Sequence, residues 1–100
     1  MSSPQIVFHP EAVAEAQAAA RWYQERIVSA GEAFLNELDN AVEMISASPE
    51  IGPQYVQNTR RHLFRRFPFY LVCRNVSEKL EIIAVAHGRR RPGNWKDRMA

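Results

Sequence analysis

The sequence predicts an α+β fold with the element order β-α-α-β-β-β, in which an N-terminal helical hairpin packs on a small antiparallel sheet. Two observations support this prediction. Between residues 10 and 47 apolar residues recur at steps of three and four, the period of an amphipathic helix. From residue 60 onward the period becomes two, and aromatic and branched residues become frequent, as in strands. One hundred residues suffice for a single small domain over residues 1–100.

The first half of the chain predicts one strand followed by two helices. The run QIVF predicts a strand over residues 4–8, and Pro10 suits the first position of the helix after it. Gly31 indicates the break between the helices or part of a tight turn between them, and the second helix is expected from about residue 31 to Ala47. The predicted apolar stripes are Val13, Ala16, Ala20, Tyr23 and Ile27 in the first helix, and Phe34, Leu38, Ala41, Val42 and Ile45 in the second.

The second half predicts a loop, three strands in a meander and a short C-terminal helical turn. The loop is SPEIGPQY, which is rich in proline and glycine. The strands are RRHLFRRF, FYLVCRNV and LEIIAVAH, separated by Pro68 and by the polar turn VSEK. In the middle strand Phe69, Leu71 and Cys73 share one face, and Tyr70, Val72 and Arg74 share the other. The last strand is almost continuously apolar, which is typical of a central strand covered on both faces.

The net charge of +2 conceals a division between the two halves of the chain. Residues 1–59 hold two arginines and eight acids, a net charge of −6, whereas residues 60–100 hold eleven bases and three acids, a net charge of +8. Such asymmetry predicts an anionic partner for the second half, which can be a nucleic acid, an acidic protein segment or an acidic membrane surface.

The sequence also restricts the location of the protein and its cofactors. No apolar run is long enough to span a membrane, and the N-terminus lacks the pattern of a secretion signal. The single cysteine, Cys73, fits a reducing cytoplasm and is expected to be a small buried hydrophobe. The three histidines are far apart and no glycine-rich phosphate loop is present, so no metal and no cofactor are expected. The acid pairs Glu11/Glu15 and Asp39/Glu43 are expected on solvated helix faces.

Basic residues of the second half are the candidate binding residues. Arg61 and Arg65 would project from one face of a regular strand, and Arg74 lies on the neighbouring strand. His87 ends the last strand and Arg89, Arg90 and Arg91 follow it, so these residues are expected to converge on one rim of the sheet. Guanidinium groups make two-pronged contacts with phosphate. The alternative is that these arginines only solvate and protect exposed strands.

Trp95 allows two interpretations. Its indole can offer a stacking face beside the arginines, or it can hold the C-terminal turn against the core of the sheet.

The segments FPFYLVCR and IIAVAHGRRRPGNW, together with a helical hairpin that ends in SP..G, resemble the RelE/ParE toxins of type II toxin–antitoxin modules. The likeness is to the ParE-like branch often called plasmid stabilisation proteins, and it covers nearly the whole chain. It implies a compact α+β fold, inhibition of growth, and a cognate antitoxin that wraps and neutralises the toxin. A homodimer or a toxin–antitoxin hetero-oligomer is therefore expected.

Two mechanisms occur among these toxins. RelE-like members cut mRNA in the ribosome, and ParE-like members poison DNA gyrase. Arg61 and Arg65 match the basic strand of the ribonucleases, but Tyr70 stands where those enzymes often carry arginine. Trp95 falls near their C-terminal aromatic position, and an indole cannot relay a proton as a phenol does.

His87 is the candidate general acid or base, or a structural histidine at a strand end. The resemblance favours a gyrase poison of ParE type. A ribosome-dependent endoribonuclease and a non-toxic RNA- or protein-binding module are the alternatives.

Overall fold

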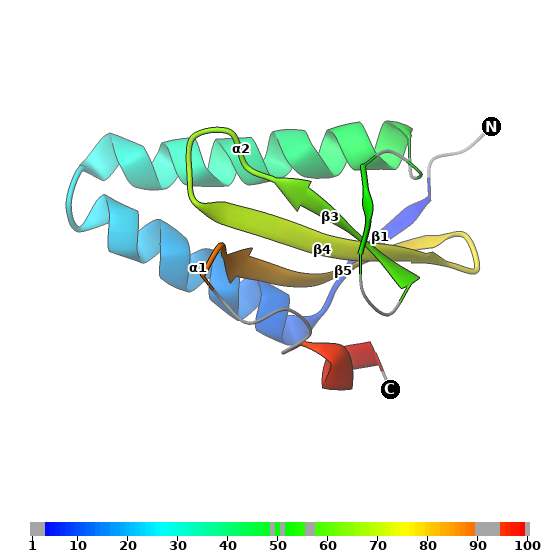
Figure 1. Ribbon diagram of the computed structural model, residues 1–100. Coiled ribbons are helices and arrows are strands. Elements are labelled where there is room, and N and C mark those ends of the chain that lie inside the picture. The colour runs from blue at the N-terminus through cyan, green and yellow to red at the C-terminus, as the bar shows by residue number, and fades with distance from the viewer. Residues whose placement is uncertain (1–3, 49, 51, 56–57, 90–94, 100) are drawn as a thin grey trace.

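The computed structural model describes residues 4–48, 50, 52–55, 58–89 and 95–99 and confirms the predicted α+β class and element order (Figure 1). Its elements are β1 (Gln5–Phe8), α1 (Pro10–Gln24), α2 (Val28–Ala47), β2 (Gln54–Tyr55), β3 (Thr59–Leu63), β4 (Phe69–Val76), β5 (Lys79–His87) and the short 3-10 helix η2 (Lys96–Met99). The sequence did not indicate β2, which has two residues and lies within the expected loop.

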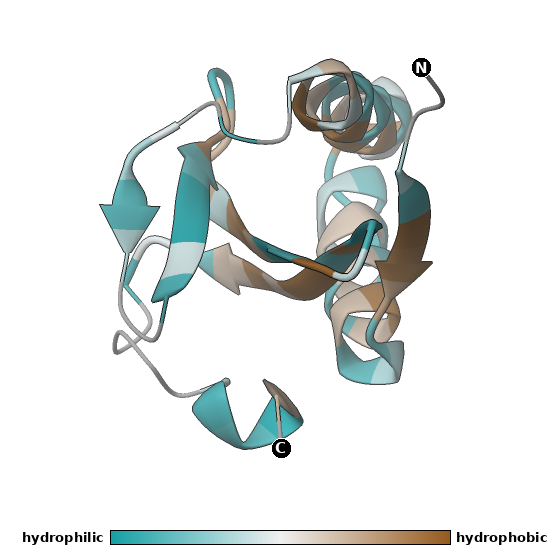
Figure 2. Cartoon of the chain, turned by 90° about the vertical axis from the view of Figure 1, so that its right-hand side faces the viewer, coloured by the Kyte–Doolittle hydropathy of each residue, from teal (hydrophilic) through white to brown (hydrophobic). Residues whose placement is uncertain are grey.

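The strands form one sheet in the order β1-β5-β4-β3-β2. Strands β2 to β5 are antiparallel neighbours, which is the predicted meander extended by β2. Strand β1 pairs with β5 in parallel, so the sheet is mixed at this one edge. Both helices lie on one side of the sheet, and β1 is at the edge that lies beside them (Figure 2).

The two helices pack closely through small residues. Helix α1 buries four alanines, Ala12, Ala16, Ala19 and Ala20. The predicted stripe was wrong at Val13 and Ile27, which are 38% and 63% exposed. A narrow alanine face lets α1 approach both α2 and β5, whereas Ile27 has left the helix and lies in the turn between α1 and α2.

Gly31 does not mark the break between the helices, which lies at residues 25–27. It lies in the first turn of α2 and faces the end of α1. A Cβ atom at this position would lie 2.8 Å from Gln24 Cβ and 2.9 Å from the Ala20 carbonyl oxygen. Gly31 is therefore required by the close approach of two helices, and α2 begins three residues before it.

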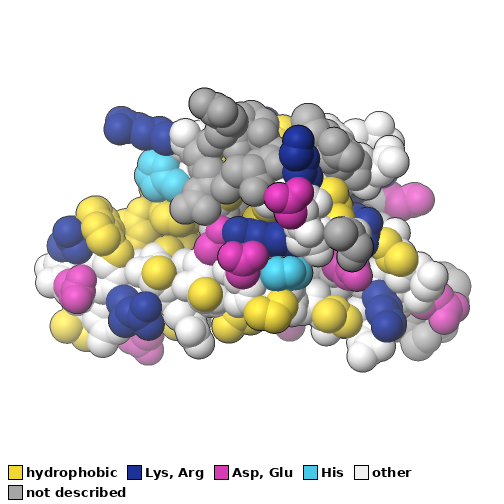
Figure 3. Space-filling model, turned by 90° about the horizontal axis from the view of Figure 1, so that it is seen from below, with side chains coloured by type: hydrophobic (Ala, Val, Ile, Leu, Met, Phe, Trp, Pro, Cys, Tyr) yellow, Lys and Arg dark blue, Asp and Glu magenta, His cyan; other side chains and the backbone are white. Residues whose placement is uncertain are grey.

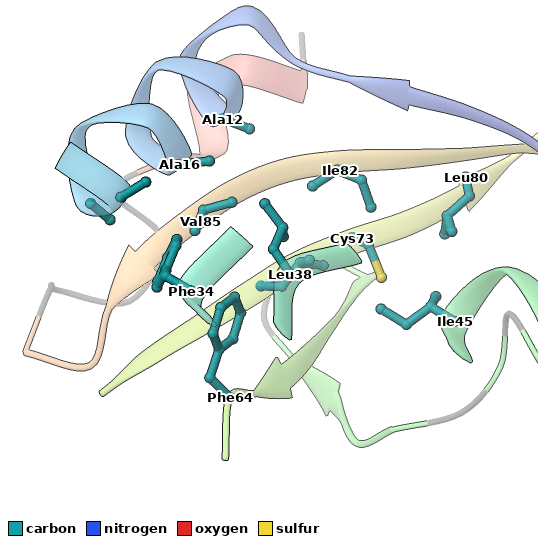
Figure 4. Close-up of a cluster of buried hydrophobic side chains, with 13 residues drawn as sticks. Ala12, Ala16, Phe34, Leu38, Ile45, Phe64, Cys73, Leu80, Ile82 and Val85 are labelled. Atoms are coloured by element: carbon teal, nitrogen blue, oxygen red, sulfur yellow. The ribbon is translucent and has the colours of Figure 1, made fainter. Parts of the chain in front are cut away.

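The main core lies between the helices and the sheet (Figure 4). Phe34 of α2 is fully buried, with ring centroids 5.2 Å from Phe64 and 5.1 Å from Phe69. A second cluster covers the opposite face of the sheet and contains Tyr70, Val72, Ile83, Ala84, Ala86 and Trp95. Burial on both faces confirms the interpretation of the last strand, and Leu71 and Val72 lie on the opposite faces predicted for them.

A β-bulge in β5 changes which side chains face the helices. Val72 pairs with Ala84 and Cys73 pairs with Ile82, so Ile83 is an extra residue. Before the bulge Leu80 and Ile82 face the helices, and after it Val85 does so. His87, two residues beyond Val85, therefore also lies on the helix side, where a regular strand would have placed it on the other face.

Candidate functional site

Arg61 lies on the sheet face away from the helices, against an aromatic cluster. Its Cζ atom is 4.8 Å from the ring centroid of Tyr55 and 5.5 Å from that of Tyr70. The Arg61 Nε is buried and has no hydrogen-bond partner within the part of the chain that the structure describes. Cation–π contacts orient this half-buried guanidinium and leave it able to bind an acceptor.

Arg74 lies on the same face of the sheet but is paired within the protein. Its Nε donates to Glu81 Oε1 at 2.6 Å, and the two residues are cross-strand neighbours. The side chains are 27% and 32% exposed, so the guanidinium is accessible, but part of its charge is neutralised. Arg74 is therefore a weaker candidate than Arg61 for binding an anion.

Arg65 does not share a strand face with Arg61, because β3 ends at Leu63. The backbone N–H groups of Arg65 and Arg66 donate to the Glu37 carboxylate of α2, which ties the β3–β4 turn to that helix. The side chain of Arg65 is exposed in this turn.

Arg89 is exposed just beyond β5, and its backbone N–H donates to His87 Nδ1 at 3.1 Å. Arg90 and Arg91 lie outside the described residues. Their predicted binding role stays a prediction.

His87 is half-buried on the helix side of the sheet. Its ring contacts Phe69 edge-on at a centroid distance of 5.1 Å. Together with Trp22 and Tyr23 of α1 it lines a mainly apolar hollow of about 390 Å³. Because Nδ1 accepts the Arg89 N–H, proton transfer in this arrangement is left to Nε2.

Among the described candidates, the structure does not bring Arg61, Arg74 and His87 together on one rim. Arg61 and Arg74 share the face away from the helices, whereas the bulge at Ile83 sends His87 to the helix side. Arg74 pairs with Glu81 near the start of β5, and His87 ends that strand. Arg61 and Arg74 therefore lie on the opposite face of the sheet from His87, and Arg74 also lies near the opposite end of β5, whereas Arg89 adjoins His87.

Trp95 is 1% exposed and packs in the second cluster, with its ring centroid 6.1 Å from that of Tyr55. This burial matches the structural role that the sequence allowed for it. Because the indole is buried, it offers no exposed face on which a partner could stack in this arrangement.

An ion pair that sequence reasoning missed joins α1 to η2. Arg98 donates from Nη1 and Nη2 to the two Glu15 carboxylate oxygens at 2.9 and 2.8 Å, and the side chains are 10% and 14% exposed. Glu15 was expected on a solvated face; it is instead largely buried where α1 meets β5. Glu11 also lies 3.5 Å from Arg98. Figure 3 shows acidic and basic side chains gathered in the middle of the face seen from below.

The same pair satisfies the backbone of β5 where β1 no longer covers it. The Val85 N–H donates to Glu15 at 3.0 Å, and Arg98 Nη1 donates to the Ile83 carbonyl at 3.0 Å. Two side chains thus replace the missing neighbouring strand. Glu15 and Arg98 are 83 positions apart, so no local pattern could reveal the contact.

Burial shifts the pKa values of His62 and Cys73 in opposite directions. Burial, and secondarily the charge of Arg60, lowers the pKa of His62, whose Nε2 has no hydrogen-bond partner among the described residues. Burial raises the pKa of the Cys73 thiol to about 11, although Arg60 opposes this. Cys73 is therefore a neutral core residue and a poor nucleophile.

The described residues contain no group of three His, Cys, Asp or Glu side chains that could hold a metal ion. None of the helices in the described ranges is long and apolar enough to cross a membrane.

Comparison with known proteins places this fold in a family. The sequence profile described as "ParE toxin of type II toxin-antitoxin system, parDE" matches residues 6–92. A solved structure titled "Chromosomal ParDE TA system from P. aeruginosa" superposes with a TM-score of 0.75 at 16% identity, covering 85% of this chain and 96% of that one. No curated protein matches the sequence. Since the profile spans most of the chain, this protein belongs to the ParE toxin family of type II toxin–antitoxin systems.

Proposed function

We propose that this toxin acts by binding DNA gyrase rather than by cutting RNA, and that a cognate antitoxin neutralises it. The observation that carries the choice is the separation of His87 from Arg61 and Arg74, which lie on the other face of the sheet. We infer gyrase as the target because the sequence resembles the ParE-like branch of these toxins. Since gyrase acts in the cytoplasm, the toxin is expected to act there as well.

RNA cleavage by attack of a 2′-hydroxyl requires a base or acid and cationic groups at the same phosphate. Arg61 is oriented by two tyrosine rings, and the candidate acid or base His87 lies on the other face of the sheet. His87 contacts Phe69 and the hollow beside α1 instead. This arrangement supports a protein that recognises its target through Arg61 and transfers no proton.

The antitoxin proposal rests on charge as well as on family. The +8 half of the chain contains β3, β4 and β5, and Arg61 has a buried Nε without a hydrogen-bond partner among the described residues. An acidic antitoxin segment over this face would pair with the accessible part of the half-buried Arg61 guanidinium and compete with the target.

The test uses purified wild-type protein in two assays, gyrase supercoiling of plasmid DNA and primer extension on mRNA translated by ribosomes. We expect inhibition of supercoiling and no new mRNA ends. Because Arg61→Gln removes a charged hydrogen bond to the target, we expect it to weaken the inhibition of gyrase by about tenfold or more. His87→Gln should change it by no more than about fivefold, the cost of one ordinary contact.

Arg21→Gln, which removes an exposed arginine from α1, is the matched control and should behave as the wild type. New mRNA ends that disappear in His87→Gln, with a loss of about 10²–10⁴-fold in rate, would show instead that the protein is a ribonuclease. Absence of both activities in protein that binds an antitoxin would identify the non-toxic binding module.

A further inference from the structure

Strand β1 exposes one unpaired edge of the sheet. It is the terminal strand and pairs only with β5 among the described elements. The N–H groups of Gln5 and His9 donate toward β5, to the carbonyls of Glu78 and Ile82. Because successive residues of a strand point to opposite edges, the backbone N–H and C=O groups of Ile6 and Phe8 point outward. Such an edge is a template for another strand.

A groove separates this edge from α2. Ile6 lines a hollow of about 610 Å³ together with Asn40, Glu43 and Met44. Phe8 lines an adjoining hollow of about 650 Å³, which also contains Asn40 and Glu43 as well as Asp39. The two hollows share Asn40 and Glu43 of α2 and together make up the groove, which is lined by both apolar and polar side chains.

The rim of this groove carries negative charge that the described residues do not neutralise. Helix α2 contains Glu32, Glu37, Asp39 and Glu43 and no basic residue. Glu37 accepts the N–H groups of the β3–β4 turn. The side chains of Asp39 and Glu43 have no ion pair or hydrogen bond in the described part of the chain, and their i, i+4 spacing places like charges side by side. A cation bound between them would relieve this repulsion.

We propose that this groove binds an extended segment of a partner protein in which basic and apolar side chains alternate, and that the segment adds to the outer edge of β1. In an added strand, alternate side chains point toward α2. Lysine or arginine there covers Ile6 and Phe8 with its stem and reaches Asp39 and Glu43 with its charge. The intervening side chains lie beside Val7, which is 36% exposed, and are therefore apolar.

This proposal stands on β1 and α2 alone, and none of its residues belongs to the surface proposed for gyrase. The −6 charge of the first half and the +8 charge of the second thus predict two partner surfaces of opposite sign.

The first test titrates the full-length, isotope-labelled protein with a capped decapeptide of alternating lysine and valine, followed by NMR. We expect shift changes in β1 and in residues 36–47 of α2. A glutamate–valine peptide should bind at least about tenfold more weakly, and so should the lysine–valine peptide to Asp39→Asn/Glu43→Gln. The control variant Glu25→Gln/Glu32→Gln removes two exposed acids elsewhere and should bind within about twofold of the wild type.

The second test alters only the peptide, so the fold of the protein is unaffected. One peptide is N-methylated at every valine and another at every lysine. Because an added strand uses the N–H groups of alternate residues, one pattern should abolish binding and the other should preserve it. Three results would overturn the proposal. The two methylated peptides could bind equally well, the glutamate–valine peptide could bind as tightly as the lysine–valine peptide, or the NMR shift changes could be confined to β3 and β4. The proposal would also be overturned if the protein dimerised as its own concentration is raised and the NMR signals of β1 changed. The groove would then be occupied by a second copy of the chain.

Discussion

Replacing Arg98 by methionine tests the ion pair that joins η2 to α1. In the native protein the Glu15 carboxylate receives two bonds from Arg98 and one from the Val85 N–H. The substitution leaves this carboxylate 14% exposed in its native position, without a cation. Removing one partner of a fully buried pair costs about 3–5 kcal/mol of unfolding free energy. Partial exposure of the Glu15 carboxylate and its remaining bond from the Val85 N–H reduce this cost. We therefore expect Arg98→Met to lower the unfolding free energy by about 3 kcal/mol, which lowers Tm by about 12–24 °C for a chain of this size.

The assay is urea unfolding followed by far-UV circular dichroism for Arg98→Met, Glu15→Gln and the double variant. The double variant should be less destabilised than the sum of the two single variants, because it removes both charges together. We expect a coupling free energy of about 1.5–3 kcal/mol, within the range found for residues in direct contact. Little of it should be lost in 0.5 M salt, since a buried pair is weakly screened.

Glu25→Gln is the matched control. Glu25 lies 4.0 Å from Arg26 in a pair whose side chains are 74% and 52% exposed, so its removal should cost less than about 0.5 kcal/mol. A coupling energy below about 0.5 kcal/mol between Glu15 and Arg98, or equal stability of Arg98→Met and the control, would refute the assignment of a buried pair.

Three further predictions concern His62 and Cys73. Because the pKa of His62 in the folded protein is below its ordinary value of 6.5, its contribution to stability is complete above that pH and is lost as the pH falls. His62→Gln should flatten the dependence of unfolding free energy on pH below 6.5; an unchanged slope would exclude this histidine as its source. Because burial raises the pKa of Cys73 from 9.0 to about 11, stability should decline as the pH rises through that interval, and less so in Cys73→Ala. At pH 8 a thiol-reactive disulfide should label the native protein at least about 10³-fold more slowly than the unfolded chain, and rapid labelling would contradict the burial of Cys73.

The spacing of apolar residues along the sequence correctly predicted the buried faces of α2 and β4. The stripe of α2 places Phe34, Leu38 and Ile45 in the core, as its three- and four-residue spacing indicated. The alternation in β4 separates Leu71 from Val72, because successive side chains of a regular strand point to opposite faces. The family was also accessible from sequence, and its profile matches residues 6–92.

Side-chain positions in the candidate site depended on contacts between distant segments. The face occupied by His87 is set by the bulge at Ile83, and this bulge exists only in the register of β5 against β4. Burial of Glu15 required Arg98, and the position of Gly31 required the end of α1 beside it. Hydrophobic periodicity within a segment shows which face of that helix or strand is apolar. The amino-acid sequence alone was therefore enough to predict the apolar faces of α2 and β4. Strand register, helix separation and ion pairing are properties of two segments brought together, and they appear only when the chain is folded.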